Sequence, residues 1–324
     1  MIYQQNTIGG NITVFDETKG YEKVGEMAFG DNLICDSIVL SADTSTLYAN
    51  ATNRWEFWQQ PLTQQRSAFA AFDAKTFEEK WRIPLPGSIE HFAASPCKRY
   101  IYNAHYDRKL VTKVDVETQD VTPIQTANMG GHKVRVSADG ERCYVGSIVW
   151  GSFDEIDTQK NVWKRHYTFE DNVRPFVLTS DGKTAYIQLS RLHGFHVFDL
   201  DAWTITRTVK MPGALEGAGD PPCEDRYPFT IDHGAEITPD GHHLVMLATT
   251  GHYAAVYTLP DLELVKTIPL GKEPSYLTMA ATKPLCYISC RASSALYVVD
   301  TTTWDVVHIL EKVGAFPQRV CVDH

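Results

Sequence analysis

Residues 135–146 read RVSADGERCYVG, and residues 177–188 read VLTSDGKTAYIQ. Each stretch consists of a short apolar run, a Ser/Thr-x-Asp-Gly turn, and a second apolar run that contains a tyrosine. Asp and Gly favour tight turns, because the Asp carboxylate accepts hydrogen bonds from nearby backbone amides and glycine readily adopts a positive φ. Two apolar runs joined by such a turn predict a β-hairpin.

The same pattern returns along the whole chain. Its turns start at Ser41, Ser95, Ser137, Thr179, Thr238 and Ala280, at intervals of 54, 42, 42, 59 and 42 residues. A second motif, an apolar residue followed by Asp at a turn, has the same basic spacing and contains Asp16, Asp73, Asp115, Asp157, Asp199 and Asp300, with Tyr257-Thr258 in the sixth position. Two turn motifs in a period of about 42 residues predict four short strands per unit, which is the length of a propeller blade.

The seventh unit is divided between the two ends of the chain. Residues 317–324, PQRVCVDH, look like an inner strand, and residues 1–25 look like the strands that would follow it. Pairing them completes a seventh blade and removes two exposed sheet edges. We therefore predict an all-β fold, with residues 1–324 forming a single domain. The fold is a seven-bladed β-propeller of four-stranded antiparallel blades, and the N- and C-terminal strands share blade seven.

The strand after each Asp-Gly turn resembles that of the YVTN-type propellers. The matching strands are residues 47–50, 101–103, 143–146, 185–187 and 286–289, whereas residues 244–246 depart from the pattern. The resemblance covers nearly the whole chain and implies the propeller fold. The superfamily includes amine-dehydrogenase propeller subunits, lactonases, a muconate cycloisomerase, an antibiotic lyase and scaffolds without activity, so the resemblance does not select a reaction.

Composition argues against several classes of partner. The formal net charge is −10 and no run of Lys or Arg occurs, which argues against nucleic acid. No segment reaches the ~18 apolar residues that span a bilayer, and residues 1–16 lack the pattern of a signal peptide. Seven irregularly spaced cysteines favour a reducing, cytoplasmic location, although a leader removed from the sequence is compatible with the same composition. The oligomeric state stays open.

Two cysteines require a separate interpretation. Cys286 and Cys290 lie four residues apart on one predicted strand and therefore share a face. Two buried structural thiols are the preferred interpretation, and a zinc-binding pair is the alternative.

A ring of polar residues is predicted where the inner strands begin. The position five residues before each turn is occupied by Asp36, Glu90, His132, Arg174, His233, Ser275 and Gln318, and the position two residues further on is always apolar. A register shift by one residue would put Ser37 and His91 in place of Asp36 and Glu90. Two insertions, residues 51–66 and 211–229, are predicted on the same face of the propeller and suggest a rim or lid.

Further polar and aromatic residues are predicted on this face. They are His91 beside the ring, His105, Trp150, Arg191, His193, His252, Tyr253 and Arg291 in loops between second and third strands, and Trp55 and Trp58 in the first insertion. Histidine exchanges protons near neutral pH, Arg binds oxyanions, and aromatic side chains line small-molecule pockets. This set therefore predicts a substrate-binding site at the channel mouth.

The first functional hypothesis is an enzyme for a small anionic or oxygen-rich molecule. His132 and His233 act as general acid and base, Arg174 stabilises a carboxylate or enolate, and Asp36 or Glu90 orients a histidine. This chemistry fits a lyase, an isomerase or cyclase, or a lactone hydrolase. No cofactor motif is present, but a variant of the hypothesis places a divalent metal among His132, His233 and a carboxylate.

The second hypothesis is a non-catalytic propeller. It acts as a small-molecule sensor or as a protein-interaction scaffold, with the aromatic segment WEFW at residues 55–58 contacting the partner.

Overall fold

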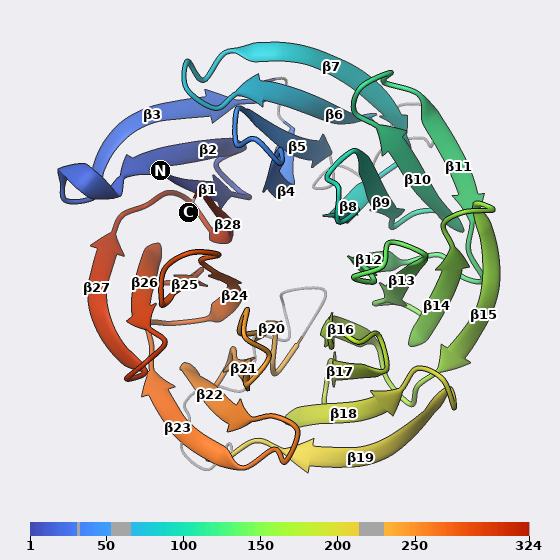
Figure 1. The fold of residues 1–324 in the computed structure, drawn as a ribbon. Helices are drawn as coiled ribbons and strands as arrows, with labels where there is room; N and C mark the ends of the chain where they lie inside the picture. The colour runs from blue at the N-terminus through green and yellow to red at the C-terminus, as the bar shows by residue number, and fades with distance from the viewer. Residues whose placement is uncertain (31–32, 53–65, 214–229, 324) are drawn as a thin grey trace. The chain divides into compact units, whose positions relative to one another are not determined.

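Antiparallel sheets account for nearly all of the secondary structure (Figure 1). The computed structural model describes residues 1–30, 33–52, 66–213 and 230–323. They form seven four-stranded antiparallel sheets, with the strands of six sheets following one another in sequence. The chain is thus a seven-bladed β-propeller, which confirms the prediction. It divides into two compact units: residues 1–168 with 321–323 form the first unit, and residues 169–320 form the second.

The first unit contains the strands β1 (Ile2–Asn6), β2 (Asn11–Asp16), β3 (Glu22–Ala28), β4 (Ile34–Leu40), β5 (Thr46–Thr52), β6 (Arg66–Asp73), β7 (Glu79–Pro86), β8 (Ile89–Ala94), β9 (Tyr100–His105), β10 (Leu110–Asp115), β11 (Val121–Gln125), β12 (Gly131–Val136), β13 (Arg142–Ser147), β14 (Ser152–Asp157) and β15 (Val162–Thr168). A short 3-10 turn, Glu17–Lys19, lies between β2 and β3. No helix in the described ranges is long and apolar enough to cross a membrane.

The second unit contains the strands β16 (Val173–Leu178), β17 (Thr184–Leu189), β18 (Gly194–Asp199), β19 (Thr204–Lys210), β20 (Ala235–Ile237), β21 (His243–Ala248), β22 (Tyr253–Thr258), β23 (Leu264–Pro269), β24 (Pro274–Met279), β25 (Leu285–Cys290), β26 (Ala295–Asp300) and β27 (Asp305–Glu311). The last strand, β28 (Pro317–Val322), belongs to the sheet β28-β1-β2-β3. The divided seventh blade is therefore confirmed.

The two turn motifs have the predicted hydrogen bonds. In the hairpin between β12 and β13, the Ser137 hydroxyl donates to the Asp139 carboxylate at 2.5 Å, and this bond lowers the pKa of Asp139. After β14, the Asp157 carboxylate accepts from the backbone amides of Gln159 at 3.0 Å and Lys160 at 2.9 Å. The carboxylates close the turns between strands, as Asp does at such positions.

The core lies between neighbouring sheets, where aromatic side chains pack on one another. In the first unit, the Phe69 ring on β6 stacks on Tyr48 of β5 at 6.0 Å and meets Phe92 of β8 edge to face at 5.8 Å. In the second unit, Phe195 of β18 meets Tyr257 of β22 edge to face at 5.4 Å. The Phe69–Phe92 and Phe195–Tyr257 contacts join one sheet to the next, whereas the Phe69–Tyr48 contact lies within one sheet. Aromatic pairs of this geometry add to the free energy of burial.

The pairing between the third strand and the outermost, fourth strand of each sheet is irregular or involves a proline. A register shift occurs in six of the seven pairs formed by a third and a fourth strand. The seventh pair, β10 with β11, has no shift, but its edge strand contains Pro123. Bulges and edge prolines both oppose pairing with another strand.

Most of both predicted insertions lies outside the described residues. The structure describes residues 51, 52 and 66 of the first and residues 211–213 of the second. Trp55 and Trp58 fall among residues 53–65, so their predicted role at the channel mouth stays a prediction, as does the single-domain organisation.

Deletion of residues 317–324 should strongly destabilise the protein. It removes the inner strand of the sheet β28-β1-β2-β3 and leaves β1 as an unpaired edge. We expect the melting temperature to fall by more than about 10 °C, measured by circular dichroism. The control Asp323→Asn weakens the exposed ion pair with the Met1 amino group but keeps strand β28, and it should change the melting temperature little. Equal melting of the deletion variant and the full chain would contradict this closure.

Candidate functional site

Five inner strands carry a register shift near their start in the part of the chain whose pairing the structure describes. The shifts fall between Cys35 and Ser37, Ile89 and Phe92, Gly131 and Lys133, Val173 and Phe176, and Pro274 and Tyr276. Each shift encloses a residue of the predicted polar ring: Asp36, Glu90, His132, Arg174 or Ser275. A β-bulge bends the strand and redirects the side chain of the extra residue. Polar residues therefore occupy these positions without displacing the apolar residue two positions later.

All seven residues of the predicted ring are buried. Their exposed fractions are 1% for Asp36, 1% for Glu90, 5% for His132, 1% for Arg174, 4% for His233, 0% for Ser275 and 8% for Gln318. A solvated rim would leave charged side chains exposed. Ionisable groups are seldom buried to this extent unless they are paired, bind a ligand or have a chemical role.

In the first unit, strand β8 packs against both β4 and β12, so the parts of these three strands that carry ring residues lie together. The Ser37 hydroxyl on β4 lies 3.2 Å from Nδ1 of His91 on β8. The His91 ring meets the His132 ring of β12 edge to face, with centroids 4.5 Å apart. His91 is 2% exposed, so two buried imidazoles and a hydroxyl form one continuous group.

Glu90 belongs to the same group. Donor atoms of Glu90, His91 and His132 all lie within 4.8 Å of one another. The Asn50 amide of β5 donates to the backbone oxygen of Glu90 at 2.6 Å, which holds the β8 backbone at this point. Glu90 and His91 both lie in the register shift of β8. The sequence offered either Glu90 or His91 for the ring position of this strand, depending on the register. In the structure both residues belong to the group.

In the second unit, hydrogen bonds orient two other ring residues. The Arg174 Nε donates to the Ser190 hydroxyl at 2.7 Å, which orients the guanidinium plane. Nδ1 of His233 lies 3.0 Å from the Ser275 carbonyl oxygen. A carbonyl oxygen only accepts, so Nδ1 carries the proton, and Nε2 is the basic nitrogen of the neutral ring.

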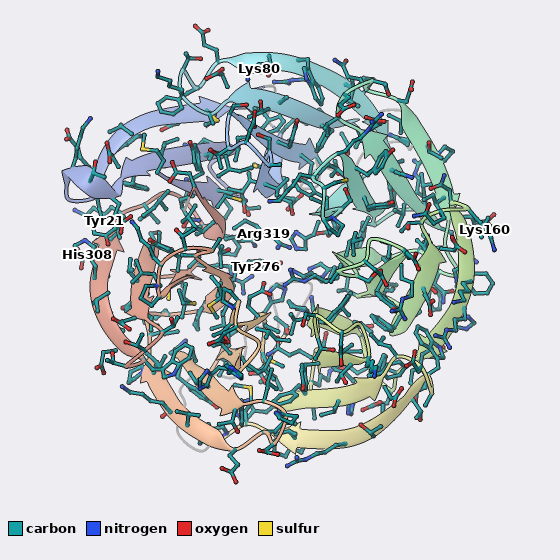
Figure 2. The ribbon with its side chains drawn as sticks, in the orientation of Figure 1. Tyr21, Lys80, Lys160, Tyr276, His308 and Arg319 are labelled. Carbon is teal, nitrogen blue, oxygen red and sulfur yellow. The ribbon has the colours of Figure 1, made fainter. Side chains whose placement is uncertain are left out.

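The backbone beside His233 requires glycine. Gly234 has φ +146°, and a Cβ there would lie 2.5 Å from a Leu247 methyl group and 3.1 Å from the Ser275 oxygen. Tyr276 follows Ser275, and its ring lies 4.8 Å from the His233 ring. The Arg319 guanidinium covers Tyr276 at 4.3 Å, and Figure 2 labels both side chains. His233 is thus held by a hydrogen bond and an aromatic contact.

A third group contains one residue that the sequence pattern did not indicate. His193 Nδ1 lies 3.1 Å from the carboxylate of Asp232, and its Nε2 lies 3.1 Å from the Tyr253 hydroxyl. The hydrogen bond to Asp232 raises the pKa of His193, and burial raises the pKa of Asp232. In the sequence, Asp232 could have been noticed as an acidic residue directly before His233. Only the fold shows that Asp232 pairs with His193.

The other predicted site residues occupy varied environments. His105 is fully buried at the end of β9, with Nε2 3.0 Å from the Thr112 hydroxyl. Trp150, in the turn before β14, is 56% exposed, and the exposed Arg191 lies near Asp171. His252 Nδ1 lies 3.1 Å from the Thr249 backbone oxygen. The Arg291 guanidinium lies above the Phe316 ring, 5.0 Å from its centroid.

The cysteine pair is buried in β25. Burial raises the pKa of Cys290 to about 12, and it raises the pKa of Cys286 as well. Both thiols are buried, as the structural interpretation expects, and the zinc-binding pair stays the alternative hypothesis.

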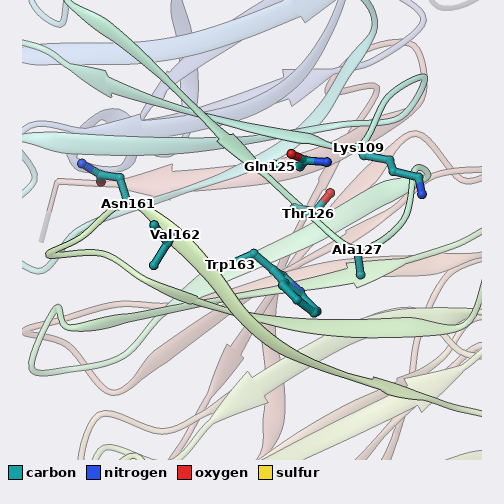
Figure 3. Close-up of a pocket in the computed structure, with 7 residues that line it drawn as sticks. All are labelled: Lys109, Gln125, Thr126, Ala127, Asn161, Val162 and Trp163. Carbon is teal, nitrogen blue, oxygen red and sulfur yellow. The ribbon is translucent and has the colours of Figure 1, made fainter.

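A separate pocket of the first unit lies among the outer strands (Figure 3). Its volume is about 460 Å³, and its lining residues are Lys109, Gln125, Thr126, Ala127, Asn161, Val162 and Trp163. The Trp163 indole donates to the buried Asp154 carboxylate at 3.3 Å, and burial raises the pKa of Asp154 to about 6. None of the predicted site residues that the structure describes lines this pocket.

Comparison with known proteins identifies the fold but no family. No protein-family model matches the chain, and no curated protein sequence does either. Among solved structures, the chain is similar to hydrazine synthase from Kuenenia stuttgartiensis, with a TM-score of 0.71, 16% identity and coverage of 90% of each chain. It is also similar to the dihydro-heme d1 dehydrogenase NirN in complex with DHE, with a TM-score of 0.64, 13% identity and coverage of 96% of this chain and 63% of that one. The resemblance to YVTN-type propellers is thus supported only as a fold.

His105 should make the protein less stable in acid. Burial lowers the pKa of His105 to about 4, whereas the unfolded chain takes up this proton near 6.5. Between those values the unfolded state binds more protons, so stability falls as the pH drops from 6.5 to 4, by on the order of 3 kcal/mol for this residue. His105→Gln should flatten this decline in urea unfolding at several pH values. The exposed His308→Gln is the control, and an unchanged slope in the His105 variant would refute the assignment.

Asp154 should have the opposite effect. Because burial raises the pKa of Asp154 to about 6, the folded state takes up this proton before the unfolded state does. Its contribution therefore increases as the pH falls from 6 towards 4, by on the order of 2 kcal/mol. In the same urea experiment, Asp154→Asn should lose stability in acid more steeply than the wild type. A shallower slope would show that Asp154 is ionised in the folded state throughout this range.

Proposed function

We propose that the protein is an enzyme that transforms a small anionic or oxygen-rich molecule by acid–base chemistry. The supporting observation is the buried group at the start of the inner strands of the first unit, where the His91 and His132 rings lie 4.5 Å apart beside Glu90. Imidazoles exchange protons near neutral pH, and a carboxylate or second imidazole nearby adjusts which proton is held. His132 is the proposed acid or base of this group.

The second unit holds two further candidate residues, Arg174 and His233. The hydrogen bond from Arg174 Nε to Ser190 reduces the rotational freedom of the guanidinium, which suits recognition of a carboxylate or enolate. His233 donates through Nδ1 to the Ser275 oxygen, so its Nε2 is suited to accept a proton. We assign His233 as the base and Arg174 as the anion-stabilising residue, with Asp36 or Glu90 orienting a histidine.

The proposed reaction class is proton transfer coupled to elimination, isomerisation, cyclisation or lactone opening. These reactions develop negative charge on oxygen, as an enolate, a carboxylate or the oxyanion of a tetrahedral intermediate, and a buried guanidinium stabilises such charge. The two structural neighbours are named as enzymes, a hydrazine synthase and a dihydro-heme d1 dehydrogenase. They support the view that a propeller of this architecture hosts chemistry, and their own reactions are not transferred to this chain.

A ligand screen with matched variants tests the proposal. Wild type, His132→Ala/His233→Ala and the surface control His308→Ala are heated with carboxylates, lactones and aromatic acids, in parallel buffers with and without EDTA. We expect one compound class to raise the melting temperature of the wild type and control by several degrees but not that of the double variant. Conversion of that compound, followed by mass spectrometry, should fall by about 100-fold or more in His132→Ala.

Two results would count against an enzyme. A compound that stabilises the wild type and the control but not the double variant, and that is never converted, would favour a small-molecule sensor. A compound class that stabilises the double variant as much as the wild type would place the binding site elsewhere in the chain.

A further inference from the structure

We propose that Glu90, His91 and His132 bind one divalent first-row transition metal ion. The inference rests on the proposed enzymatic function and revises one role in it, because a metal-bound His132 acts as a ligand and leaves proton transfer to His233. It differs from the metal set expected from the sequence, which combined His132 with His233. The new set lies entirely within the first unit, on β8 and β12.

The donor set favours a particular class of metal. Two imidazoles and one carboxylate form catalytic zinc sites and the facial triad of non-haem iron enzymes. Mg²⁺ and Ca²⁺ prefer oxygen ligands and fit two imidazoles poorly. The three residues are buried, with exposed fractions of 1% for Glu90, 2% for His91 and 5% for His132. In this respect the group differs from the acidic clusters on many protein surfaces, whose side chains are exposed.

The distances are close to those of a metal site. The three donor atoms lie within 4.8 Å of one another. In a tetrahedral site with metal–ligand bonds near 2 Å, donor atoms are separated by about 3.3 Å. Binding therefore requires the donor atoms to approach one another by about 1.5 Å or less, which side-chain rotation can provide. Because Glu90 and His91 both lie in the register shift of β8, two consecutive residues contribute to one group.

Neighbouring residues support the ligands as they do in metal sites. His91 Nδ1 lies 3.2 Å from the Ser37 hydroxyl, so Nε2 is the ring nitrogen assigned to the metal. Metal-binding histidines almost always donate the other ring N–H to a fixed acceptor. Ser37 is itself held by the Phe92 amide, which donates to its hydroxyl at 3.4 Å. Asn50 fixes the Glu90 backbone through its carbonyl oxygen.

The charge of the group also favours a cation. Two neutral imidazoles and one carboxylate carry a net charge of −1, and a dication compensates this buried charge. Asp36 and Lys133, which neighbour Ser37 and His132 in sequence, are also buried, with exposed fractions of 1% and 3%. Their charges are opposite in sign and together leave the net charge of the region unchanged. The competing arrangement is a protonated histidine paired with Glu90, which needs no metal. A metal held by three side chains would keep at least one coordination position for water or a substrate oxygen.

Metal titration of the untagged, full-length protein distinguishes these arrangements. The protein is stripped with EDTA, dialysed and titrated with ZnCl₂ by calorimetry and with CoCl₂ by visible absorption. We expect one ion per chain, a Zn²⁺ dissociation constant below about 1 μM, and cobalt d–d bands that report imidazole and carboxylate ligands. Zn²⁺ should also raise the melting temperature.

Three ligand variants and one control test the assignment. His91→Ala, His132→Ala and Glu90→Gln should each weaken Zn²⁺ binding by about 100-fold or more, whereas His308→Ala should not change it. Glu90→Gln keeps the side-chain shape, and circular dichroism verifies that each variant is folded. Absence of Zn²⁺ binding by the folded wild type, or undiminished binding by Glu90→Gln and His132→Ala, would overturn the proposal. Because turnover is not measured, these results are independent of the ligand screen for acid–base activity.

Discussion

The extra residue near the start of the inner strands is the constraint on which the candidate site depends. In a regular strand, residues two apart face the same side, so a polar residue and an apolar residue at that spacing would compete for one environment. The register shifts at Asp36, Glu90, His132, Arg174 and Ser275 remove this conflict. The apolar residue still enters the core between sheets, while the polar one is redirected. The propeller can thus hold ionisable side chains next to its hydrophobic core.

The same device explains why the first unit gathers so many ionisable groups in a small volume. A regular strand would turn Glu90 and His91 to opposite faces, and only one of them could join His132. Within the shift of β8, both do. The cost of burying a carboxylate is considerable, and the surrounding structure offsets it only through charge or hydrogen-bond partners. Acid–base chemistry and metal binding are two uses of such a group that agree with its composition.

The fold and the ring position were predictable because both come from repetition. Six turn segments with a common spacing identify the blades, and Asp139 and Asp157 close turns as their residue type suggests. The partners of individual site residues were not predictable. His91 joins the site through a bulge, and a bulge has no signature in a single sequence. Asp232 pairs with His193 from 39 positions away, a contact that only the assembled sheets create. The contact between His105 Nε2 and the Thr112 hydroxyl on the next strand was likewise not predictable, and a role of His105 in substrate binding stays a prediction.

The interrupted pairing of the outer strands affects how the protein behaves among its own copies. Every four-stranded sheet ends in a strand whose outward amides and carbonyls could accept a partner strand, and a chain of seven such sheets offers this opportunity repeatedly. Shifts in six outer pairs and a proline in the seventh edge strand break the regular spacing that an added strand would need. Such irregular edges oppose the strand-by-strand addition of further copies by which sheets grow into fibrils.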